Sequence, residues 1–564
     1  MARFAWAGLI VVLIFDVWLR AHTFEPTLRA DLGLRLWPSA RGATEPLDCD
    51  EAAYAYMGRR LLRGDVLYRD VSENKPPLGY WIYTLAVAAG GTRELPIRLL
   101  PIPFALATIA AVWSIARRVA GGGAACVAAC VCAVMTTDPF VFGNGSNLEH
   151  MMNAFGTIAL AFYVASESAT RRRVLLLALA GVFLGLAALV KQVVFPFGFV
   201  VAVAILTRPG ASLKVRARDL ACWSGAGLAV CLAAALILVA QGAGSWAFDD
   251  IFVYGRAIAT DVPADPHAPS RWIRWLTGNA DPQGRLPWPF GRTDYLVWWG
   301  AGAWPLWLAS AASMFVLAVA PRGDGRRPRL LIVAWTLAAW AQVVLPGQYW
   351  QHYYMLPIPG TAIVVAVALG DGLRGWRASL KSRAVAGILG AAALCGALCA
   401  AIVATIAIQG DEYLRQPPEQ LAIRDKGGGQ WLALRDLGRT INRATRGWHD
   451  PRLFVWGWQS PLHTYGALDG VTREFFTNAL LKTYADTDHA LVKPRTERIM
   501  RDLERHPPEF IFCGYPPFRE LSTFLDERYV PSTLTPLNPS KLGLWVEKTR
   551  YGAFENDLHS RMRE

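Results

Sequence analysis

Residues 47–83 contain the side chains whose chemistry is easiest to interpret from the sequence alone. This stretch reads LDCDEAAYAYMGRRLLRGDVLYRDVSENKPPLGYWIY. Asp50 and Glu51 stand at the start of a segment with helical periodicity, where a carboxylate either caps the helix or acts as a general base. Capping is the commoner role, and Asp48 with Glu51 three residues later has the spacing of a capping box. The hypothesis of a general base therefore applies first to Asp50.

Lys75 is the second residue in this stretch that could take part in chemistry, because two prolines, Pro76 and Pro77, follow it directly. A proline restricts the preceding residue to an extended conformation, so the Lys75 side chain is held in one direction. An ammonium group presented near lipid headgroups suits a phosphate. A lysine that merely extends from an apolar surface to water has the same pattern.

The segment between these two residues predicts a short amphipathic helix that ends near Gly64. Its apolar face would carry Tyr54, Met57 and Leu61, and its basic face Arg59, Arg60 and Arg63. This pattern is typical of a helix that lies on a bilayer surface.

The composition indicates that these residues belong to a membrane protein. Of the 564 residues, 53% are hydrophobic and only 18% are charged, whereas a soluble domain has about a quarter charged residues. This excludes a disordered chain. The 50 glycines and 23 tryptophans agree with helix packing in lipid and with aromatic residues at its interfaces.

The fold class predicted is a polytopic α-helical membrane protein with about eleven transmembrane helices. A span needs about 20 apolar residues, and the segment at 194–207 is short enough to be a half-helix. The candidate spans are 4–20, 97–116, 122–142, 151–168, 174–192, 194–207, 220–241, 294–320, 330–347, 354–371 and 384–408.

Basic residues in every second loop predict the orientation of the chain, because cytoplasmic loops are rich in Lys and Arg. The clusters are Arg117/Arg118, Arg171–Arg173, Arg208–Arg218, Arg322–Arg329 and Arg374–Arg383. With these loops and the N-terminus in the cytoplasm, the outer side receives the first loop, 21–96, the long loop 242–293 and the tail. Residues 77–91 would reverse this order if they crossed the membrane, so they are predicted to form an interfacial or re-entrant helix on the outer side.

The tail, residues 409–564, has charges throughout and is typical of a small soluble α/β domain beyond a transmembrane domain of residues 1–408. Strands are predicted at 453–458, 509–515 and 543–548, and a helix at 428–445. Cys49 and Cys513 lie in the two polar regions, and the sequence leaves open whether they pair. The net charge of +13 is explained by orientation and contact with anionic lipid, and no signature of nucleic-acid binding is present.

The motif series in the first outer loop resembles that of the C-superfamily glycosyltransferases, and above all family 39. The matching pieces are Asp50-Glu51, Tyr54, Gly64 with LYRD, and KPPLGYWI at 75–82. This family contains protein O-mannosyltransferases and lipid A aminoarabinose transferases. The resemblance implies that Asp50 is the catalytic acid, Glu51 the second acidic position and Lys75 the contact to the donor phosphate.

Weaker matches lie further along the chain. NLEHMMNAF (147–155) places Glu149 where the family often has an acid at the outer start of a span, and GLAALVKQ (185–192) places Lys191 at the outer end of a helix. QYWQHYYMLPIPG (348–360), with His352 and Tyr353, resembles the loop in which the family meets lipid phosphate. All four residues are candidates for binding the donor phosphate or substrate. VWGWQSPLHTYGA (455–467) resembles the tails of bacterial members. Two departures argue against aminoarabinose and lipid A: Asn74 replaces an acid before Lys75, and His352 stands where a lysine is usual.

The function that the resemblance implies is transfer of a sugar from a polyprenyl-phosphate donor to a lipid, glycan or protein acceptor of the cell envelope. The reaction would be inverting and would take place on the outer side of a bacterial inner membrane, without a metal ion or another cofactor. A flippase for lipid-linked sugars and a membrane-anchored sensor are the alternatives. Asp16, within the first span, is a weaker candidate for a catalytic role. Asp249, Asp250 and Arg256 lie in the long outer loop, and a loop of this length suggests acceptor binding or lid motion.

Overall fold

The computed structural model of the protein describes residues 2–37, 42–255, 303–319, 325–346, 350–426, 429–477, 480, 488–535 and 539–561. Within it the chain forms two compact units, which are described separately. The first consists of Met1–Thr44, Arg98–Ala234 and His267–Leu421. The second consists of Glu45–Ile97, Ala235–Pro266 and Ala422–Glu564.

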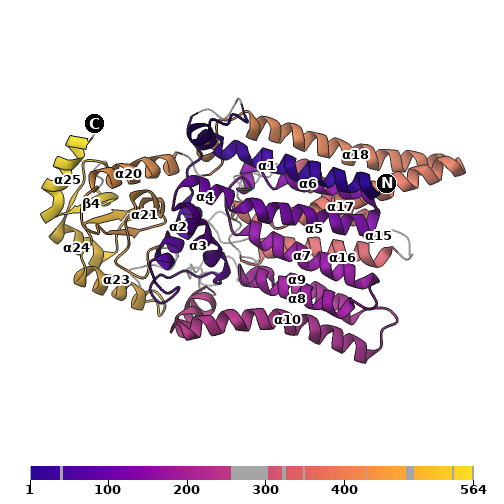
Figure 1. Ribbon diagram of the computed structural model, residues 1–564, viewed down its shortest axis with the longest axis horizontal. Coiled ribbons are helices and arrows are strands. Elements are labelled where there is room, and N and C mark those ends of the chain that lie inside the picture. Colours follow the sequence, from indigo (N-terminus) through magenta and orange to yellow (C-terminus); the bar gives the residue numbers. More distant parts are fainter. Residues whose placement is uncertain are drawn as a thin grey trace, which may run out of the picture. The chain divides into compact units, whose positions relative to one another are not determined.

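The first unit is a bundle of long helices that run side by side (Figure 1). Short 3-10 helices η1 (Pro139–Val141), η2 (Gln192–Val194) and η4 (Gln351–Met355) and the π-helical turn η5 (Gly410–Leu414) interrupt or extend it. Helix α17 is central, since it contacts α5, α6, α15, α16 and α18. The helices are α1 (Ala2–Leu32), α5 (Pro101–Ala120), α6 (Gly122–Met135), α7 (Glu149–Ser168), α8 (Arg173–Ala188), α9 (Phe195–Leu206), α10 (Leu213–Ala240), α15 (Trp304–Val319), α16 (Arg326–Val344), α17 (Ile358–Ser382) and α18 (Val385–Gln409).

Small residues bring several of these helices into close contact. A Cβ atom on Gly360 of α17 would lie 2.6 Å from Oγ1 of Thr336 on α16. A Cβ on Gly185 of α8 would lie 2.6 Å from the carbonyl oxygen of Gly227 on α10. Close approach of backbones at small residues is the usual way in which helices associate in lipid, where no hydrophobic driving force acts between them.

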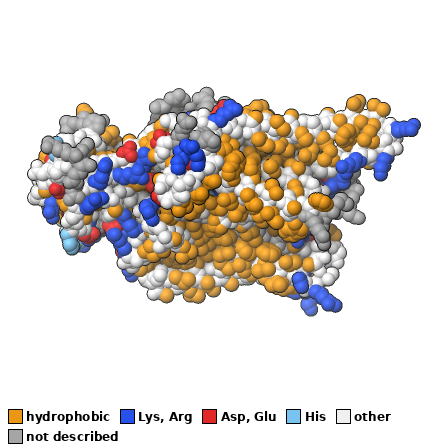
Figure 2. Space-filling model, turned by 45° about the horizontal axis from the view of Figure 1, so that its top comes forward, with side chains coloured by type: hydrophobic (Ala, Val, Ile, Leu, Met, Phe, Trp, Pro, Cys, Tyr) orange, Lys and Arg blue, Asp and Glu red, His pale blue; other side chains and the backbone are white. Residues whose placement is uncertain are grey.

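Among the described residues, five helical stretches are long and apolar enough to cross a membrane. On the face that Figure 2 shows, apolar side chains cover the helices, and Lys and Arg side chains gather at their right-hand end. Each of the eleven predicted spans coincides with a helix, although only residues 303–319 of the span at 294–320 are described. The count of eleven crossings stays a prediction. The five long stretches are Phe4–Leu32, Glu94–Ala120, Leu213–Ala240, Gln351–Ser382 and Val385–Leu414.

The second unit contains a four-stranded sheet in the order β1-β2-β4-β3. β1 (Leu453–Trp456) and β2 (Phe510–Cys513) are parallel; β4 (Gly543–Glu547) is antiparallel to β2 and to β3 (Tyr529–Pro531). Three of these strands occupy the predicted runs. Alternate residues of a strand point to opposite faces, and helices cover both. One apolar core joins Phe454 and Ile511 to α23 (Lys493–Arg505) and α24 (Arg519–Arg528), and the other joins Val455 and Phe510 to α20 (Gln430–Ala444) and α25 (Lys548–Arg561).

The remaining helices of this unit come from the first outer loop and from three later segments of the chain. They are α2 (Cys49–Leu62), α3 (Leu78–Gly90), α4 (Glu94–Leu99), α11 (Gly244–Phe248), the π-helical turn η3 (Asp249–Tyr254), α19 (Pro418–Asp425) and α21 (Pro461–Gly466). Helix α2 packs on α3 and α21. The thiols of Cys49 and Cys513 are both free. The helix predicted at 77–91 is present as α3, and its interfacial position stays a prediction.

Helix α2 does not lie on a surface, and this part of the sequence interpretation is wrong. Residues Glu51–Gly58 are all buried, and α3 and α21 of the same unit pack against the helix. The side chains of Arg59 and Arg60 are only 11% and 13% exposed. Arg59 donates to the Leu468 carbonyl at 2.7 Å and to Asp469 at 2.8 Å. The basic face therefore binds the segment after α21, which amphipathic periodicity cannot distinguish from a face that meets lipid headgroups.

Candidate functional site

The start of α2 is fixed by the capping box that the sequence predicts. Oδ1 of Asp48 accepts a hydrogen bond from the Glu51 amide at 2.9 Å, and Oε2 of Glu51 accepts one from the Asp48 amide at 3.0 Å. Asp48 is 2% exposed and Glu51 is fully buried. Glu51 is thus engaged in holding the first turn of the helix. Asp50, which lies between the two, is only half-buried.

Three neighbouring carboxyl groups make this end of α2 strongly acidic. Burial and then the charge of Glu51 raise the pKa of Asp48 well above its usual range, and Asp50 adds to the effect. Lys426 acts in the opposite direction, and it forms a fully buried ion pair with Glu45 at 2.8 Å. Asp48 therefore favours the protonated form, whereas Asp50 is only half-buried.

Lys75 is held in place by three groups of the first outer loop. Its Nζ lies 3.1 Å from Oε1 of Glu73, and its own amide donates to Oε2 of Glu73 at 3.0 Å. Tyr80 donates its hydroxyl to the same carboxylate. The carbonyl of Lys75 accepts from the Tyr68 hydroxyl at 2.7 Å. The Lys75 side chain is 17% exposed, so it has a fixed direction and is partly accessible to solvent.

Asp50 and Lys75 belong to one neighbourhood within the second unit. Nζ of Lys75 lies 5.3 Å from the ring centre of Tyr54, which follows Asp50 by one turn on the same face of α2. Burial and then the charge of Asp50 raise the pKa of the Cys49 thiol, while the charge of Lys75 lowers it. The charges of Asp50 and Lys75 therefore both act on the Cys49 thiol, and the Lys75 ammonium group lies beside the ring of Tyr54.

A second cluster of predicted residues lies in the first unit, where three helix junctions meet. Glu149 begins α7, Lys191 lies between α8 and η2, and His352 lies in η4. Nζ of Lys191 forms an ion pair with Oε1 of Glu149, and Nε2 of His352 lies 3.8 Å from the same oxygen. Nζ of Lys191 also lies 4.7 Å from the ring centre of Tyr353. The structure therefore brings together the four residues that the sequence predicted from three distant segments.

The charged side chains of this cluster are buried, so each charge must be compensated by an opposite charge nearby. The side chains of Glu149 and Lys191 are 1% and 6% exposed, and that of His352 is 12% exposed. Two buried opposite charges need each other, because the loss of one leaves the other uncompensated. Asn153 of α7 donates to the Met355 carbonyl at 2.8 Å and so ties α7 to η4. Such an arrangement presents a cation and an imidazole in a fixed place, which suits an anionic group.

Asp16 has a structural partner in α1. Its Oδ2 accepts from Nε of Arg20 at 3.0 Å, and both side chains are buried. Arg20 in turn donates to the carbonyls of Gly143 and Thr136, each at 3.1 Å. The intramembrane acid therefore orients an arginine that anchors the loop before α7, which favours a structural role for Asp16.

Glu73 and Tyr80 are the functional residues that sequence reasoning left unassigned. Glu73 stands two residues before Lys75, and no periodicity pairs residues at that distance in a loop. Arg256 and most of the long outer loop lie outside the described residues. In the part of the chain that the structure describes, no three His, Cys, Asp or Glu side chains form a group that could hold a metal ion. The expectation of a metal-free enzyme stays a prediction.

Comparison with known proteins links these observations to a fold. The model of the dolichyl-phosphate-mannose-protein mannosyltransferase family matches residues 74–239, a range that includes Lys75, Glu149 and Lys191. No curated protein matches the chain. The structure of ArnT from Cupriavidus metallidurans in the apo state is similar over 97% of this chain and 98% of that one, with 17% identity and a TM-score of 0.57.

This chain has the fold of the C-superfamily glycosyltransferases. The same ArnT bound to undecaprenyl phosphate has a TM-score of 0.56 and 16% identity, over 96% of this chain and 97% of that one. The oligosaccharyltransferase AglB from Archaeoglobus fulgidus, in complex with an inhibitory peptide and a dolichol-phosphate, has a TM-score of 0.52 and 13% identity, over 90% and 69%. The resemblance predicted from the first outer loop is thereby confirmed. The chain is a multi-pass membrane protein of this glycosyltransferase fold.

Proposed function

We propose that the protein is an integral membrane glycosyltransferase that moves a sugar from a polyprenyl-phosphate donor to a cell-envelope acceptor on the outer side of the bacterial inner membrane. The observation that carries this proposal is that Asp50 and Lys75 share one neighbourhood, since the charges of both act on Cys49 and Lys75 lies beside Tyr54 on α2. The solved structures of similar fold support it, since ArnT binds undecaprenyl phosphate and AglB binds a dolichol-phosphate.

In the proposed reaction an acceptor hydroxyl attacks the anomeric carbon of the donor sugar. The bond between that carbon and the phosphate oxygen breaks, and its electron pair leaves with the polyprenyl phosphate. Asp50 accepts the proton of the acceptor hydroxyl, and Lys75 stabilises the charge that develops on the leaving phosphate. A single displacement inverts the anomeric centre.

The other predicted residues have supporting roles in this proposal. Glu51 keeps the first turn of α2 in place through the capping box, and Glu73 orients the Lys75 ammonium group. The cluster of Glu149, Lys191, His352 and Tyr353 provides a fixed polar site for the donor phosphate or substrate. Because the carboxylate of Glu149 neutralises Lys191, this cluster serves binding and orientation, whereas proton transfer falls to Asp50.

The test compares cells that lack the protein after complementation with wild type, Asp50→Asn or Asp436→Asn. Asp436 lies on α20 with a side chain 66% exposed, and its substitution is the matched control. Mass spectrometry of envelope glycans and lipids measures the product, and immunoblotting measures the protein in the membrane. Asp50→Asn should reduce transfer by about a hundredfold or more at unchanged protein level. Wild-type product from Asp50→Asn would remove Asp50 from the reaction.

A further inference from the structure

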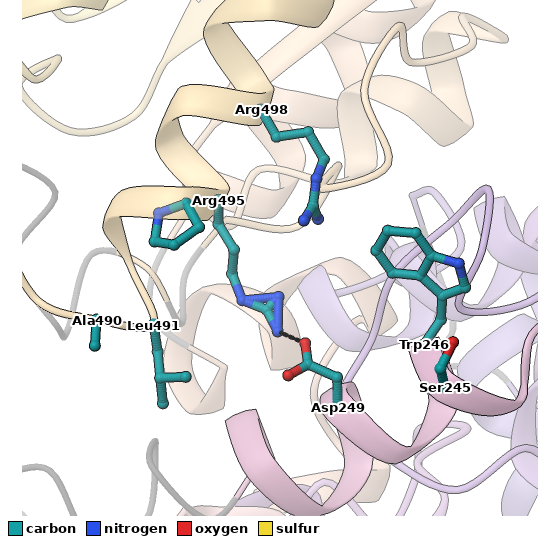
Figure 3. A pocket seen from close by; sticks show the side chains of 8 residues that line it. Ser245, Trp246, Asp249, Ala490, Leu491, Arg495 and Arg498 are labelled. Atoms are coloured by element: carbon teal, nitrogen blue, oxygen red, sulfur yellow. Dashed lines mark hydrogen bonds and ion pairs between the residues drawn. The ribbon is translucent and has the colours of Figure 1, made fainter.

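A pocket of about 360 Å³ lies in the second unit, between the start of α23 and the helices α11 and η3 (Figure 3). Its walls combine two arginines, Arg495 and Arg498, with the carboxylate of Asp249, the indole of Trp246 and the apolar side chain of Leu491. Small-molecule sites commonly have volumes of roughly 300–1,000 Å³ and a few polar groups on apolar walls. The proposed transfer reaction uses none of these residues.

The two arginines present hydrogen-bond donors to the pocket. Figure 3 shows Arg498 pointing into the space between Trp246 and Arg495. Nη1 of Arg498 donates to Glu474 at 2.8 Å, and its side chain is 27% exposed. Arg495 is 5% exposed; its Nη2 binds the carboxylate of Asp249 and lies 3.3 Å from Oδ1 of Asp250. A guanidinium group has five N–H donors, so each arginine has donors beyond those that these ion pairs use.

The charges around the pocket favour a ligand with a single negative charge. Arg473 joins the two arginines, since it pairs with Asp250 and with Glu474 at 3.1 Å. Asp250 and Glu474 are buried, whereas the side chain of Asp249 is 43% exposed. If a ligand displaced Asp249 into solvent, three guanidinium groups would face two buried carboxylates, and one positive charge would remain. A carboxylate of the ligand would then replace that of Asp249 on Arg495.

The remaining walls suit a sugar ring attached to that carboxylate. The indole of Trp246 is half-buried, with the guanidinium carbons of Arg473 and Arg498 at 4.6 and 5.1 Å from its ring centre. Trp246 and Leu491 offer apolar contact to the C–H groups of a ring, and Ser245, which also lines the pocket, offers a hydroxyl group. The pocket thus combines an arginine that can bind a carboxylate with apolar side chains that can contact a sugar ring.

Hydrogen bonds connect the residues around the pocket to the loop that carries Lys75. Asp250 accepts from the Ser72 hydroxyl at 2.9 Å, and the Ser72 amide donates to the Arg473 carbonyl at 3.0 Å. Arg473 also donates to the carbonyl of Tyr68, whose hydroxyl binds the carbonyl of Lys75 at 2.7 Å. A ligand in the pocket would therefore contact the network that supports the proposed donor site.

We propose that this pocket binds a carboxylated saccharide, a uronic acid unit of the acceptor glycan. Calling this ligand the acceptor rests on the proposed transferase function, whereas the binding site itself does not. The inference makes Arg498 and Arg495 specificity residues for an acidic glycan. Their role is to bind the acceptor away from the bond that reacts.

Isothermal titration calorimetry of the full chain in detergent micelles tests this site without any transfer assay. The probes are glucuronate, glucose, acetate and glucose 6-phosphate. Glucuronate should bind at least tenfold more tightly than glucose, which lacks the carboxylate, and than acetate, which lacks the ring. Tighter binding of glucose 6-phosphate than of glucuronate would contradict the single charge assigned to the ligand, and equal binding of glucose and glucuronate would overturn the site.

Three variants localise the binding. Arg498→Gln should weaken glucuronate binding at least tenfold, and Arg501→Gln, on the same helix but outside the pocket, should leave it unchanged. Asp249→Asn removes the competing carboxylate from an exposed side chain and should tighten binding several-fold. If neither Arg498→Gln nor Asp249→Asn changes the affinity, the ligand binds elsewhere and the inference is wrong. If the protein transfers sugar but does not bind glucuronate in this pocket, the inference is wrong and the proposed function stands. If it binds glucuronate in this pocket but transfers no sugar, the proposed function is wrong and the binding site stands.

Discussion

The ammonium group of Lys75 is held by the carboxylate of Glu73, with 3.1 Å between Nζ and Oε1. The same carboxylate accepts hydrogen bonds from the Lys75 amide and from the Tyr80 hydroxyl. Burial and then the charge of Glu73 raise the pKa of Tyr80 well above its usual range, so the phenol stays a donor. Lys75 is therefore directed by a polar network as well as by the two prolines after it.

Glu73→Gln should lower kcat about tenfold and leave the KM of the donor less affected, because the substitution keeps the shape and removes the charge that orients Lys75. A misplaced catalytic group costs up to about a hundredfold in rate. Steady-state transfer with a purified polyprenyl-phosphate donor measures both constants. Asp526→Asn is the control, since Asp526 pairs with Lys541 on the surface at 61% exposure. A kcat equal to that of wild type would show that the prolines alone orient Lys75.

The pair of Glu149 and Lys191 should show strong coupling in a double-mutant cycle. Glu149→Leu or Lys191→Met alone leaves one buried charge uncompensated, which costs about 3–5 kcal/mol. The double variant removes both charges and should regain most of the thermal stability of the detergent-solubilised protein. It should not regain transfer, because the cation beside His352 and Tyr353 is gone. Asp411→Ala, which breaks an exposed pair with Arg415, should change neither quantity; additive effects at Glu149 and Lys191 would contradict the buried pairing.

The contact between α2 and α3 depends on the missing side chain of Gly58. A Cβ atom there would lie 3.1 Å from the Thr84 amide nitrogen and 3.2 Å from the Tyr83 carbonyl carbon, both on α3. Gly58→Val should therefore destabilise the protein by about 1–3 kcal/mol and reduce transfer, since α2 carries Asp50. Thermal unfolding and the transfer assay measure the two effects. Gly225→Val on α10, where a Cβ would meet nothing within 4 Å, should leave both near wild type.

The features that the sequence predicted correctly depend on residues close together in the chain. The capping box of Asp48 and Glu51, helix α2, helix α20 and three of the strands are local patterns of periodicity and composition. Their physical basis is short-range: a cap needs three residues, and a strand needs alternation or a short apolar run. This part of the fold could be predicted without knowledge of the tertiary structure.

The features that were missed depend on contacts between distant segments. The basic face of α2 contacts Asp469, more than 400 residues later in the chain. No sequence pattern around Arg59 predicts such a partner. Lys191 and Glu149 could be placed on one side of the membrane by counting basic loops, but their ion pair follows only from the packing of α7 and α8. The pocket beside Arg498 joins α11 to α23 across more than 200 residues, so its parts look unrelated in the sequence.

His463 should make the stability of the second unit depend on pH. It is fully buried on α21, its ring centre lies 4.5 Å from that of Tyr56, and its Nδ1 lies 3.2 Å from the Leu468 carbonyl. Burial lowers its pKa to about 3, to which the charges of Arg59 and Arg60 also contribute, while the Leu468 carbonyl acts in the opposite direction. In the unfolded chain the pKa is about 6.5.

Between about pH 6.5 and pH 3 the unfolded chain binds a proton at His463 that the folded protein does not bind, so the free energy of unfolding falls as the pH is lowered. The loss is about 1.4 kcal/mol per pH unit, or about 2 kcal/mol at pH 5 relative to neutral pH. His463→Gln should therefore be less stable at pH 7.5, where it disturbs a buried ring, yet lose less stability than wild type on acidification to pH 5. Thermal unfolding at both pH values measures the difference. His559→Gln, at an exposed position on α25, should follow wild type; an equal loss in His463→Gln and wild type would mean that His463 is protonated in the folded state.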